Sequence, residues 1–432
     1  MKAGFYECDI TPPLGEFIPG NAAKFLADDV TDKLHVRAVV IEQNGEIAAM
    51  VAADILNLPV EMHDIVTKRI YEYTGIDSFR VCITANHNHK GAPILDSALY
   101  GGFADKAYRD VFYRLTADCV TLAYKRLKEV KVKFGKKEVH GISFNRNYLF
   151  ADGTLGTNMW KAEGIVGTLA GIDPDVSVIT FEHEGKPIGS VINFACHQTC
   201  VKKRGYSGDF SCIMSKELKK LYGEDYVSLF MQGTCGDINQ VDKDNFETTY
   251  APERYIEMGK ILAKAVTEAM ESSEYTDGAV SVIKESISIN TRTADDEYLM
   301  EEIPRLAKSN SMGLTRLRNL IAYNAAGVAP SFDLYIQGIK IGDDTCLYAL
   351  PGEIYVNYGL DIKAKSPFKN NLVVELSNSN LGYIPTKEAF PEFNPKSDLY
   401  EPSLTVKSCL IPEAGQIMVD KALEIGDKLR KG

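Results

Sequence analysis

Two histidines in the string TANHNHKGAP, residues 84–93, are the residues best suited to chemistry. His87 and His89 follow a predicted strand over 79–85. Side chains two apart in an extended segment point to the same face, so both imidazoles can converge on one point. Open sheets bind ligands at such strand ends. A pair of hydrogen-bonded loop histidines explains this spacing equally well, so a second element is needed.

His197 supplies that second element, at the end of the apolar segment 187–195 in the string INFACHQT. Imidazole is the commonest metal-ligating side chain, although a histidine capping a buried strand is more often a satisfied core residue. Zinc takes histidine nitrogen and carboxylate oxygen and keeps one position for water in catalytic sites. Two strand-end histidine sites therefore predict a zinc site.

An acidic partner for zinc is available at Glu353, which follows the strand 345–350 and a Pro-Gly turn. We expect it at the start of a helix over 353–364, where a carboxylate often only complements the helix dipole. Tyr383, in LGYIPT, reads by itself as a half-buried loop aromatic.

The loop GTCGDIN, residues 233–239, has two glycines beside polar residues. Such a loop can aim backbone N–H groups at an anion, and it can equally be a plain tight turn. It does not match the phosphate-binding Walker pattern. Asp209 precedes a predicted helix and by default caps it.

The elements that must position these residues alternate between strands and helices, with hairpin turns at Asn44-Gly45, Glu184-Gly185 and Gly342-Asp343. Strands are predicted at 34–42, 46–53, 79–85, 174–182, 187–195, 226–232, 279–291, 332–341, 345–350 and 371–376. Helices are predicted at 59–74, 104–129, 252–272, 296–308, 312–326 and 412–431. We expect an α/β protein with a large mixed β-sheet core flanked by helices. It should form one domain over 1–432, with 293–328 as a helical insertion, since neither a linker nor a sequence repeat is visible.

Composition narrows the class of protein. Of 432 residues, 45% are hydrophobic and 25% are charged, as in ordinary globular proteins. The net charge of −11 repels nucleic acid and anionic membrane surfaces. The sequence has no apolar stretch of transmembrane length, and acids interrupt its N-terminus before a signal peptide could form. The nine cysteines show no zinc-ribbon pairing. We expect a cytoplasmic protein that acts on a small molecule, and the oligomeric state is left open.

The chain resembles the catalytic region of the neutral, non-lysosomal ceramidase family over about residues 5–390, because its motifs follow one another in the order found in that family. The matching strings are CDITPPLGEF, LHVRAVV, AADIL, TANHNHKGAP, FNRNY, GIDPDVSVITF, INFACHQT, SGDF, GTCGDIN, PGE and LGYIPT. The resemblance implies an α/β catalytic domain on a large mixed sheet, with one zinc ion per chain.

Carried over by position, the family's zinc ligands correspond to His87, His197, Glu353 and Tyr383. The resemblance also implies that His89 lies beside the zinc-bound water and that Arg146, in FNRNY, lies close to the substrate.

Two departures bear on the substrate. Ceramidases carry a serine in a Gly-Asp-Val-Ser-Pro-Asn string, where this chain has Asn239. They also continue into a C-terminal β-sandwich, whereas we expect a single catalytic domain here, ending in the helix 412–431. Both departures point to a substrate smaller or more polar than ceramide.

The predicted function is a zinc-dependent hydrolase of an amide or ester bond. Zinc lowers the pKa of bound water from 15.7 to about 7, so no serine is required. His89 would act as general acid or base, and Arg146 would stabilise developing negative charge. Gly236, Asp237 and Asn239 are the predicted substrate-binding residues. The rival hypothesis is a non-catalytic ceramidase-like protein that keeps its metal for structure and binds a ligand.

Overall fold

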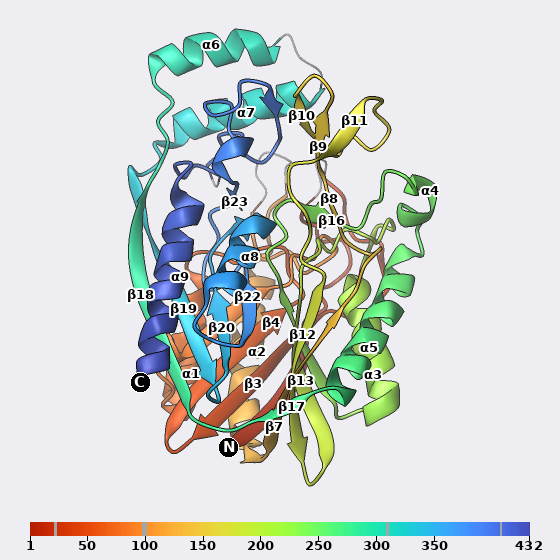
Figure 1. Ribbon diagram of the computed structural model, residues 1–432, viewed down its shortest axis with the longest axis vertical. Helices are drawn as coiled ribbons and strands as arrows, with labels where there is room; N and C mark the ends of the chain where they lie inside the picture. Colours follow the sequence, from red (N-terminus) through yellow and green to blue (C-terminus); the bar gives the residue numbers. More distant parts are fainter. Residues whose placement is uncertain (21–23, 97–101, 308–310, 407) are drawn as a thin grey trace.

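The computed structural model describes residues 1–20, 24–96, 102–307, 311–406 and 408–432, and its framework is three mixed β-sheets with helices outside them (Figure 1). In the first sheet the strand order is β5-β4-β3-β1-β6. Its main strands are β1 (Lys2–Asp9), β3 (His35–Gln43), β4 (Glu46–Ala53) and β5 (Val81–Ala85).

The other two large sheets repeat this arrangement. The second has the order β15-β13-β12-β7-β17, with main strands β7 (Lys131–Glu138), β12 (Asp175–His183), β13 (Lys186–Phe194) and β15 (Val227–Gln232). The third has the order β18-β19-β20-β22, with strands β18 (Val280–Asn290), β19 (Ser331–Ile341), β20 (Thr345–Ala349) and β22 (Asn370–Val374).

Each sheet comes from one copy of the same chain path. Three antiparallel strands are followed by a helix, a fourth strand parallel to the third, and a second helix. A parallel pair needs such a crossover, because its strands cannot be joined by a tight turn. The six helices are α1 (Met62–Thr74), α2 (Lys106–Lys125), α3 (Asp209–Tyr222), α5 (Arg254–Glu271), α8 (Val356–Lys365) and α9 (Ala414–Lys431).

The hairpin turns set the register in these units. Asn44 and Gly45 have φ values of 55° and 86°, and Glu184 and Gly185 have 51° and 76°. Two consecutive residues at positive φ form the turn whose twist matches that of the flanking strands. The three predicted hairpins β3–β4, β12–β13 and β19–β20 are thus confirmed.

The alternation of side chains along the strands builds two kinds of core. In β3, Val36, Ala38 and Val40 pack in a cluster with α1 and α2, whereas Val39 and Ile41 point to the opposite face. That opposite face belongs to a cluster that all three sheets share. The outer faces of the second and third sheets lie under α3 and α5 and under α8 and α9. In Figure 1, α9 runs beside β18 and β19, and α3 and α5 lie on the other side of the molecule.

Between β18 and β19 the chain forms α6 (Asp296–Ala307) and α7 (Ser311–Ala326), within the predicted insertion 293–328. These two helices lie at the top of Figure 1 and pack on a small separate cluster that includes Leu306, Leu320 and Tyr323.

The remaining short elements are β2 (Asp29–Val30), β6 (Lys128–Glu129), β8 (Phe144–Asn145), β9 (Asn147–Phe150), β10 (Leu155–Thr157), β11 (Ile165–Thr168), β14 (Gly205–Tyr206), β16 (Ile238–Asn239), β17 (Glu274–Thr276), β21 (Glu353–Ile354), β23 (Tyr383–Ile384), β24 (Ser397–Asp398), α4 (Phe246–Thr249), η1 (Ser78–Arg80) and η3 (Lys387–Ala389).

The predicted α/β class, with a mixed β-sheet core flanked by helices, is confirmed, but the described strands divide among several sheets and do not form one large sheet. Two boundaries were wrong. The helix expected from 353 begins at Val356, with Glu353 in β21, and the helix expected to reach 129 ends at Lys125, with Lys128–Glu129 in β6. Strands β1 and β7 and helix α3 had no predicted range. None of the described helices combines the length and the apolar composition needed to cross a lipid bilayer.

Candidate metal centre and adjoining cavity

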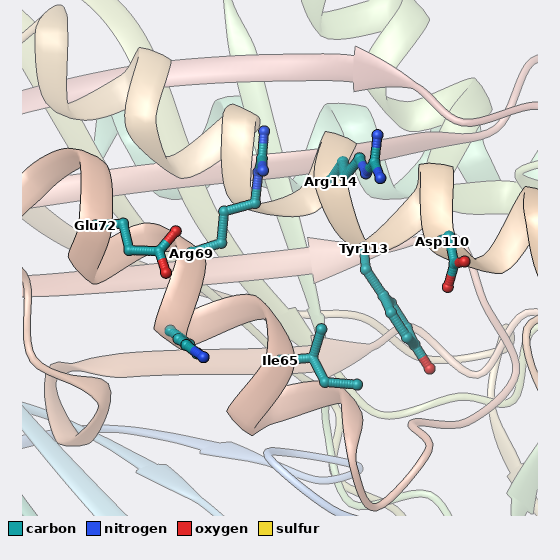
Figure 2. A pocket seen from close by; sticks show the side chains of 7 residues that line it. Ile65, Arg69, Glu72, Asp110, Tyr113 and Arg114 are labelled. Carbon is teal, nitrogen blue, oxygen red and sulfur yellow. The ribbon is translucent and has the colours of Figure 1, made fainter.

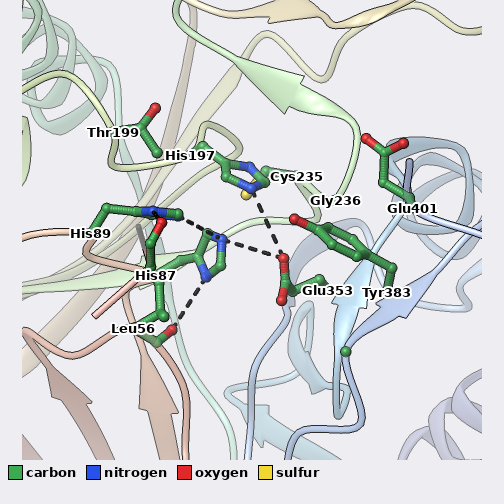
Figure 3. Close-up of polar contacts among 12 residues, drawn as sticks. Leu56, His87, His89, His197, Thr199, Cys235, Gly236, Glu353, Tyr383 and Glu401 are labelled. Carbon is green, nitrogen blue, oxygen red and sulfur yellow. Dashed lines mark hydrogen bonds and ion pairs between the residues drawn. The ribbon is translucent and has the colours of Figure 1, made fainter. Parts of the chain in front are cut away.

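Each of the three units contributes at least one side chain to a single group (Figure 3). His87 follows β5 by two residues, His197 follows β13 by three, and Glu353 follows β20 by four. The two histidine loops are tied together by a bridge between Asn88 and Gln198, in which the His89 N–H donates to the Gln198 carbonyl at 3.1 Å. The site therefore rests on strand ends that the shared core fixes.

His87 has an unusual backbone conformation, with φ of 56°. This left-handed region costs a residue with a Cβ roughly 1–2 kcal/mol. Strain of this kind concentrates at functional sites, where the surrounding structure enforces it. Here it turns the imidazole toward His89 and His197, whose ring centroids lie 4.9 and 4.3 Å from that of His87.

Backbone carbonyls set the orientation of two of the imidazoles. The Nδ1–H of His87 donates to the Leu56 carbonyl at 3.2 Å, and that of His89 donates to the Gly20 carbonyl at 3.0 Å. This leaves each Nε2 lone pair facing inward, with 3.4 Å between the two Nε2 atoms. Metal-ligating histidines commonly donate their other ring N–H in this way.

Burial keeps all three rings neutral. It lowers the pKa of His87 to about 3 and lowers the pKa values of His89 and His197 well below their usual range. The positive charge of Arg146 adds to each of these shifts. A neutral imidazole is the form that coordinates a metal ion.

Glu353 and Tyr383 face the same space from a two-stranded parallel pair, β21 and β23, in which they are direct partners. Glu353 Oε2 lies 3.4 Å from His87 Nε2 and 4.0 Å from His197 Nε2. Figure 3 shows the Tyr383 hydroxyl pointing toward this group. Burial and the negative charge of Glu353 raise the pKa of Tyr383 well above its usual range, and Arg146 opposes them.

These donors fit a zinc ion. Metal-binding nitrogens of His87, His89 and His197 all lie within 4.8 Å of one another. A tetrahedral site with bonds of ~2.1 Å has edges of about 3.4 Å, close to the spacings from His87 Nε2 to His89 and Glu353. Several imidazoles with one carboxylate suit zinc better than calcium or magnesium, which prefer oxygen ligands.

Arg146 is buried beside this group, with its guanidinium held at three points. Its Nε donates to Glu401 at 2.8 Å and its Nη2 donates to the Gly236 carbonyl at 2.7 Å, while Nη1 lies 3.2 Å from His197 Nε2. The other oxygen of Glu401 accepts a hydrogen bond from the Thr157 hydroxyl at 2.8 Å. The structure thus fixes a positive charge next to the histidines, and the place of Arg146 close to the substrate remains a prediction.

The loop GTCGDIN supports the site from behind. Asp237 is fully buried, and its carboxylate accepts hydrogen bonds from the Val356 N–H at 2.8 Å and the Asn145 amide at 2.7 Å. A Cβ added at Gly236 would come within 2.6 Å of the Glu353 carbonyl oxygen, so only glycine allows this close approach. Both residues hold Arg146 and Glu353 in position without lining the cavity, and their role in substrate binding remains a prediction.

Two buried acids of the site had no place in the sequence prediction, Glu401 and Glu375. Glu375 follows β22 and accepts hydrogen bonds from the backbone N–H groups of Cys235 and Ile354, at 3.1 and 2.7 Å. Burial raises its pKa well above the usual range. The position of Glu375 directly after an apolar strand could have indicated a role in the site. Glu401 lies in a loop whose sequence gives no such indication.

A cavity of about 520 Å³ opens beside the histidines. Asn239 lines it, with its amide donating to Asn158 Oδ1 at 3.0 Å and accepting from the Val241 N–H at 2.9 Å. The cavity is lined by Gly20, Phe25, His89, Lys90, Arg146, Asn158, Trp160, His197, Thr199, Val201, Lys202, Arg204, Asn239, Gln240, Val241, Tyr250 and Tyr383.

A second cavity, of about 270 Å³, lies between α1 and α2 (Figure 2). Its lining consists of Ile65, Lys68, Arg69, Glu72, Asp110, Tyr113 and Arg114. It contains none of the residues predicted for the site, so the candidate site is the cavity beside the histidines.

Comparisons with known proteins identify relatives of this fold. The family model for neutral/alkaline non-lysosomal ceramidase, N-terminal, matches residues 2–241. Neutral ceramidase from Pseudomonas aeruginosa has a similar structure, with a TM-score of 0.75 and 18% identity, covering 99% of this chain and 74% of that one. A ceramidase complexed with C2 gives the same TM-score and identity, covering 100% and 75%. No curated protein matches the chain.

The buried carboxyl of Asp237 yields a prediction for stability. Burial raises its pKa from 3.8 to about 6. Between these values the folded protein holds a proton that the unfolded chain has released, so this group's contribution to stability falls as pH rises from about 4 to about 6. We expect the free energy of unfolding of the wild type, relative to Asp237→Asn, to fall by about 1–3 kcal/mol over that range.

Urea unfolding of metal-free protein between pH 4 and 7 measures this difference. The exposed Asp244→Asn is the matched control and should track the wild type at every pH. Parallel curves for Asp237→Asn and the wild type would contradict the prediction.

Proposed function

The chain belongs to the neutral/alkaline non-lysosomal ceramidase family, and from this premise we propose that it is a zinc-dependent hydrolase of an amide or ester bond in a small or polar substrate. The observation that carries the proposal is the meeting of three neutral imidazoles, two buried and one half-buried, with Glu353 at one end of a cavity. A purely structural metal would need neither the open cavity nor the fixed charge of Arg146.

In this proposal His87, His197, Glu353 and Tyr383 hold the zinc ion. When bound, zinc acidifies a water molecule and polarises the scissile carbonyl. The raised pKa of Tyr383 means that its hydroxyl keeps its proton unless a cation binds beside it.

His89 is proposed as the group that moves protons. Its Nδ1–H is bound to Gly20, so its Nε2 is free to take the proton of the attacking water and deliver it to the leaving nitrogen or oxygen. Arg146 cannot lose its charge and is held by Glu401 and Gly236, so it is preorganised to stabilise the negative charge that develops on the carbonyl oxygen.

The cavity supports a small or polar substrate. Its volume is that of a site for a compact ligand, and its lining includes Asn158, Thr199, Asn239 and Gln240. Asn239 can bind a polar group through its remaining N–H but cannot act as a nucleophile. We also propose that residues 1–432 act as one domain, since each sheet contributes to one site, and the cytoplasmic location stays a prediction.

An activity screen with zinc-loaded protein tests the function. Long-chain ceramide is compared with short N-acyl amines, N-acyl sugars, lactones and simple esters. We expect a small substrate to be turned over best, with activity lost on chelation and restored by zinc. Ceramide turnover within tenfold of the best small substrate would overturn the proposed substrate size. If zinc-loaded protein hydrolyses none of these compounds, the proposed hydrolase function is refuted.

Metal content tests the proposed ligands. We expect one zinc ion per chain in the wild type and almost none in a His87→Ala, His197→Ala double variant, because the two imidazoles come from separate sheets and neither loop alone completes the site. Elemental analysis measures this, with the exposed His140→Ala as control. Full metal content in the double variant would refute the ligand assignment. If chelation unfolded the protein and no turnover were ever detected, the metal would be structural.

His89→Ala separates catalysis from metal binding. The variant should keep zinc and lose about 100- to 10,000-fold in kcat, the usual contribution of a general acid or base. Turnover and zinc content are measured on the same sample. A loss below threefold contradicts the catalytic role, and loss of zinc in proportion to activity makes His89 a ligand instead.

A further inference from the structure

The cavity carries the opposite charge to the protein as a whole. The chain has a net charge of −11, yet Lys90, Arg146, Lys202 and Arg204 line the cavity. No aspartate or glutamate is among its described lining residues. Because positive groups gathered in a recess concentrate the field there, the cavity attracts anions although the protein repels them.

Lys90 is the most unusual of these cations. It is only 7% exposed, and within the described part of the chain its ammonium group has no hydrogen bond or ion pair. Asp209 acts on it electrostatically but lies beyond ion-pair distance, with its oxygens bound to the N–H groups of Cys200 and Phe210 at 2.9 and 2.7 Å. Because Lys90 lines the cavity, an anion bound there can form a charge-assisted hydrogen bond with its ammonium group.

Other buried cations of the molecule have carboxylate partners. Arg37 lies 3.2 Å from Glu7, and Arg146 lies 2.8 Å from Glu401. Among the described residues, Lys90 is therefore the buried cation that lacks a carboxylate within ion-pair distance.

Lys202 and Arg204 reinforce the charge of Lys90 from the loop between β13 and α3. The Lys202 ammonium lies 3.7 Å from the ring centroid of Tyr250, and the Arg204 guanidinium lies 5.1 Å from that of Phe25. A ring face orients a cation without neutralising its charge. Neither side chain has a carboxylate within ion-pair distance among the described residues.

An aromatic wall adjoins these cations. Trp160 lies 5.7 Å from both Phe246 and Tyr250, and those two rings are stacked at 4.9 Å. Trp160 and Tyr250 both line the cavity. The wall offers an apolar surface to the uncharged part of a ligand whose acidic end meets Lys90.

We propose that this cavity selects substrates that carry a carboxylate, so that the substrate class is an N-acyl amino acid or a related acidic amide. The assignment rests on the proposed hydrolase function. Lys90 binds the carboxylate, Lys202 and Arg204 draw it in, and the acyl carbonyl reaches the histidines. Lys90 therefore determines specificity and takes no part in bond cleavage.

Matched substrates test the inference through turnover. N-butanoylglycine is compared with the neutral N-butanoylethanolamine on zinc-loaded protein. We expect kcat/KM to be at least tenfold higher for the acid. Lys90→Gln should lower kcat/KM for the acid at least tenfold more than it lowers kcat/KM for the neutral substrate, and so remove that preference. Equal kcat/KM for the two substrates in the wild type would overturn the inference and leave the hydrolase standing.

Two further variants keep the proposal testable if Lys90→Gln fails to fold. The Lys202→Gln, Arg204→Gln double variant alters only exposed residues and should weaken the acid preference at least threefold. Lys203→Gln removes one positive charge, as Lys90→Gln does, from the exposed residue between them, which does not line the cavity, and should leave both substrates unaffected. If Lys203→Gln weakened the acid preference as much as the double variant does, long-range attraction alone would explain the preference, and the assigned carboxylate site would be refuted.

Binding provides a readout that does not depend on turnover, because Trp160 is the only tryptophan in the chain. Zinc-loaded protein is titrated with the ketone analogues of both substrates, in which a methylene replaces the amide N–H, while tryptophan fluorescence is followed. The acidic ketone should bind at least tenfold more tightly than the neutral one, and Lys90→Gln should abolish the difference. Selective binding without hydrolysis of any amide would support the anion site and refute the proposed function. Equal binding of both ketones would refute the anion site.

Discussion

The packing of three β-sheets against one another by their inner faces is the constraint on which the rest of the structure depends. Ala, Val, Ile and Leu side chains from all three form one shared cluster, while each outer face lies under its own pair of helices. The side chains that follow β5, β13 and β20 consequently meet at one point. Metal ligands distant in sequence are thereby brought together by rigid strands, which position side chains more accurately than free loops do.

Burial at this meeting point has two electrostatic consequences. It removes the positive charge from the histidines, and the neutral imidazole is the form that coordinates a metal ion. It also demands a partner for every charge that remains, which Arg146 finds in Glu401. Arg146 then influences the histidines and Tyr383 together, so the acid–base properties of the whole centre are set as a unit.

Much of the framework could be predicted from sequence, because hairpin turns such as Asn44-Gly45 and uninterrupted apolar strands carry local signals. The family resemblance, which the family match confirms, placed His87, His197 and Glu353 at the point where the structure brings them together. Strand β7 escaped prediction because its sequence, KVKFGKKE, is mostly charged and becomes a strand only through pairing with β12. The helix boundary at 353 was wrong because the pairing of Glu353 with Tyr383 overrides local helix propensity.

Other features had no local signal at all. The threefold repeat of the chain path lies in strand order and leaves no visible sequence repeat. Glu401 depends on tertiary placement, since nothing near it in sequence distinguishes it from an ordinary loop charge, and the position of Lys90 beside the two histidines does not reveal that it lines the cavity. Long-range contacts determine where these residues lie, so local sequence patterns do not predict their positions.

The shared core also determines what happens while the chain is being synthesised. The third sheet and its covering helices occupy residues 280–431, so the inner faces of the first two sheets lack their final partner until that segment emerges. At about 5–20 residues per second this takes roughly 10–30 s, during which apolar strand faces stay open to solvent. Non-local pairing of this kind folds slowly and exposes the nascent chain to aggregation, so shielding by chaperones matters most for this protein during translation of its last third.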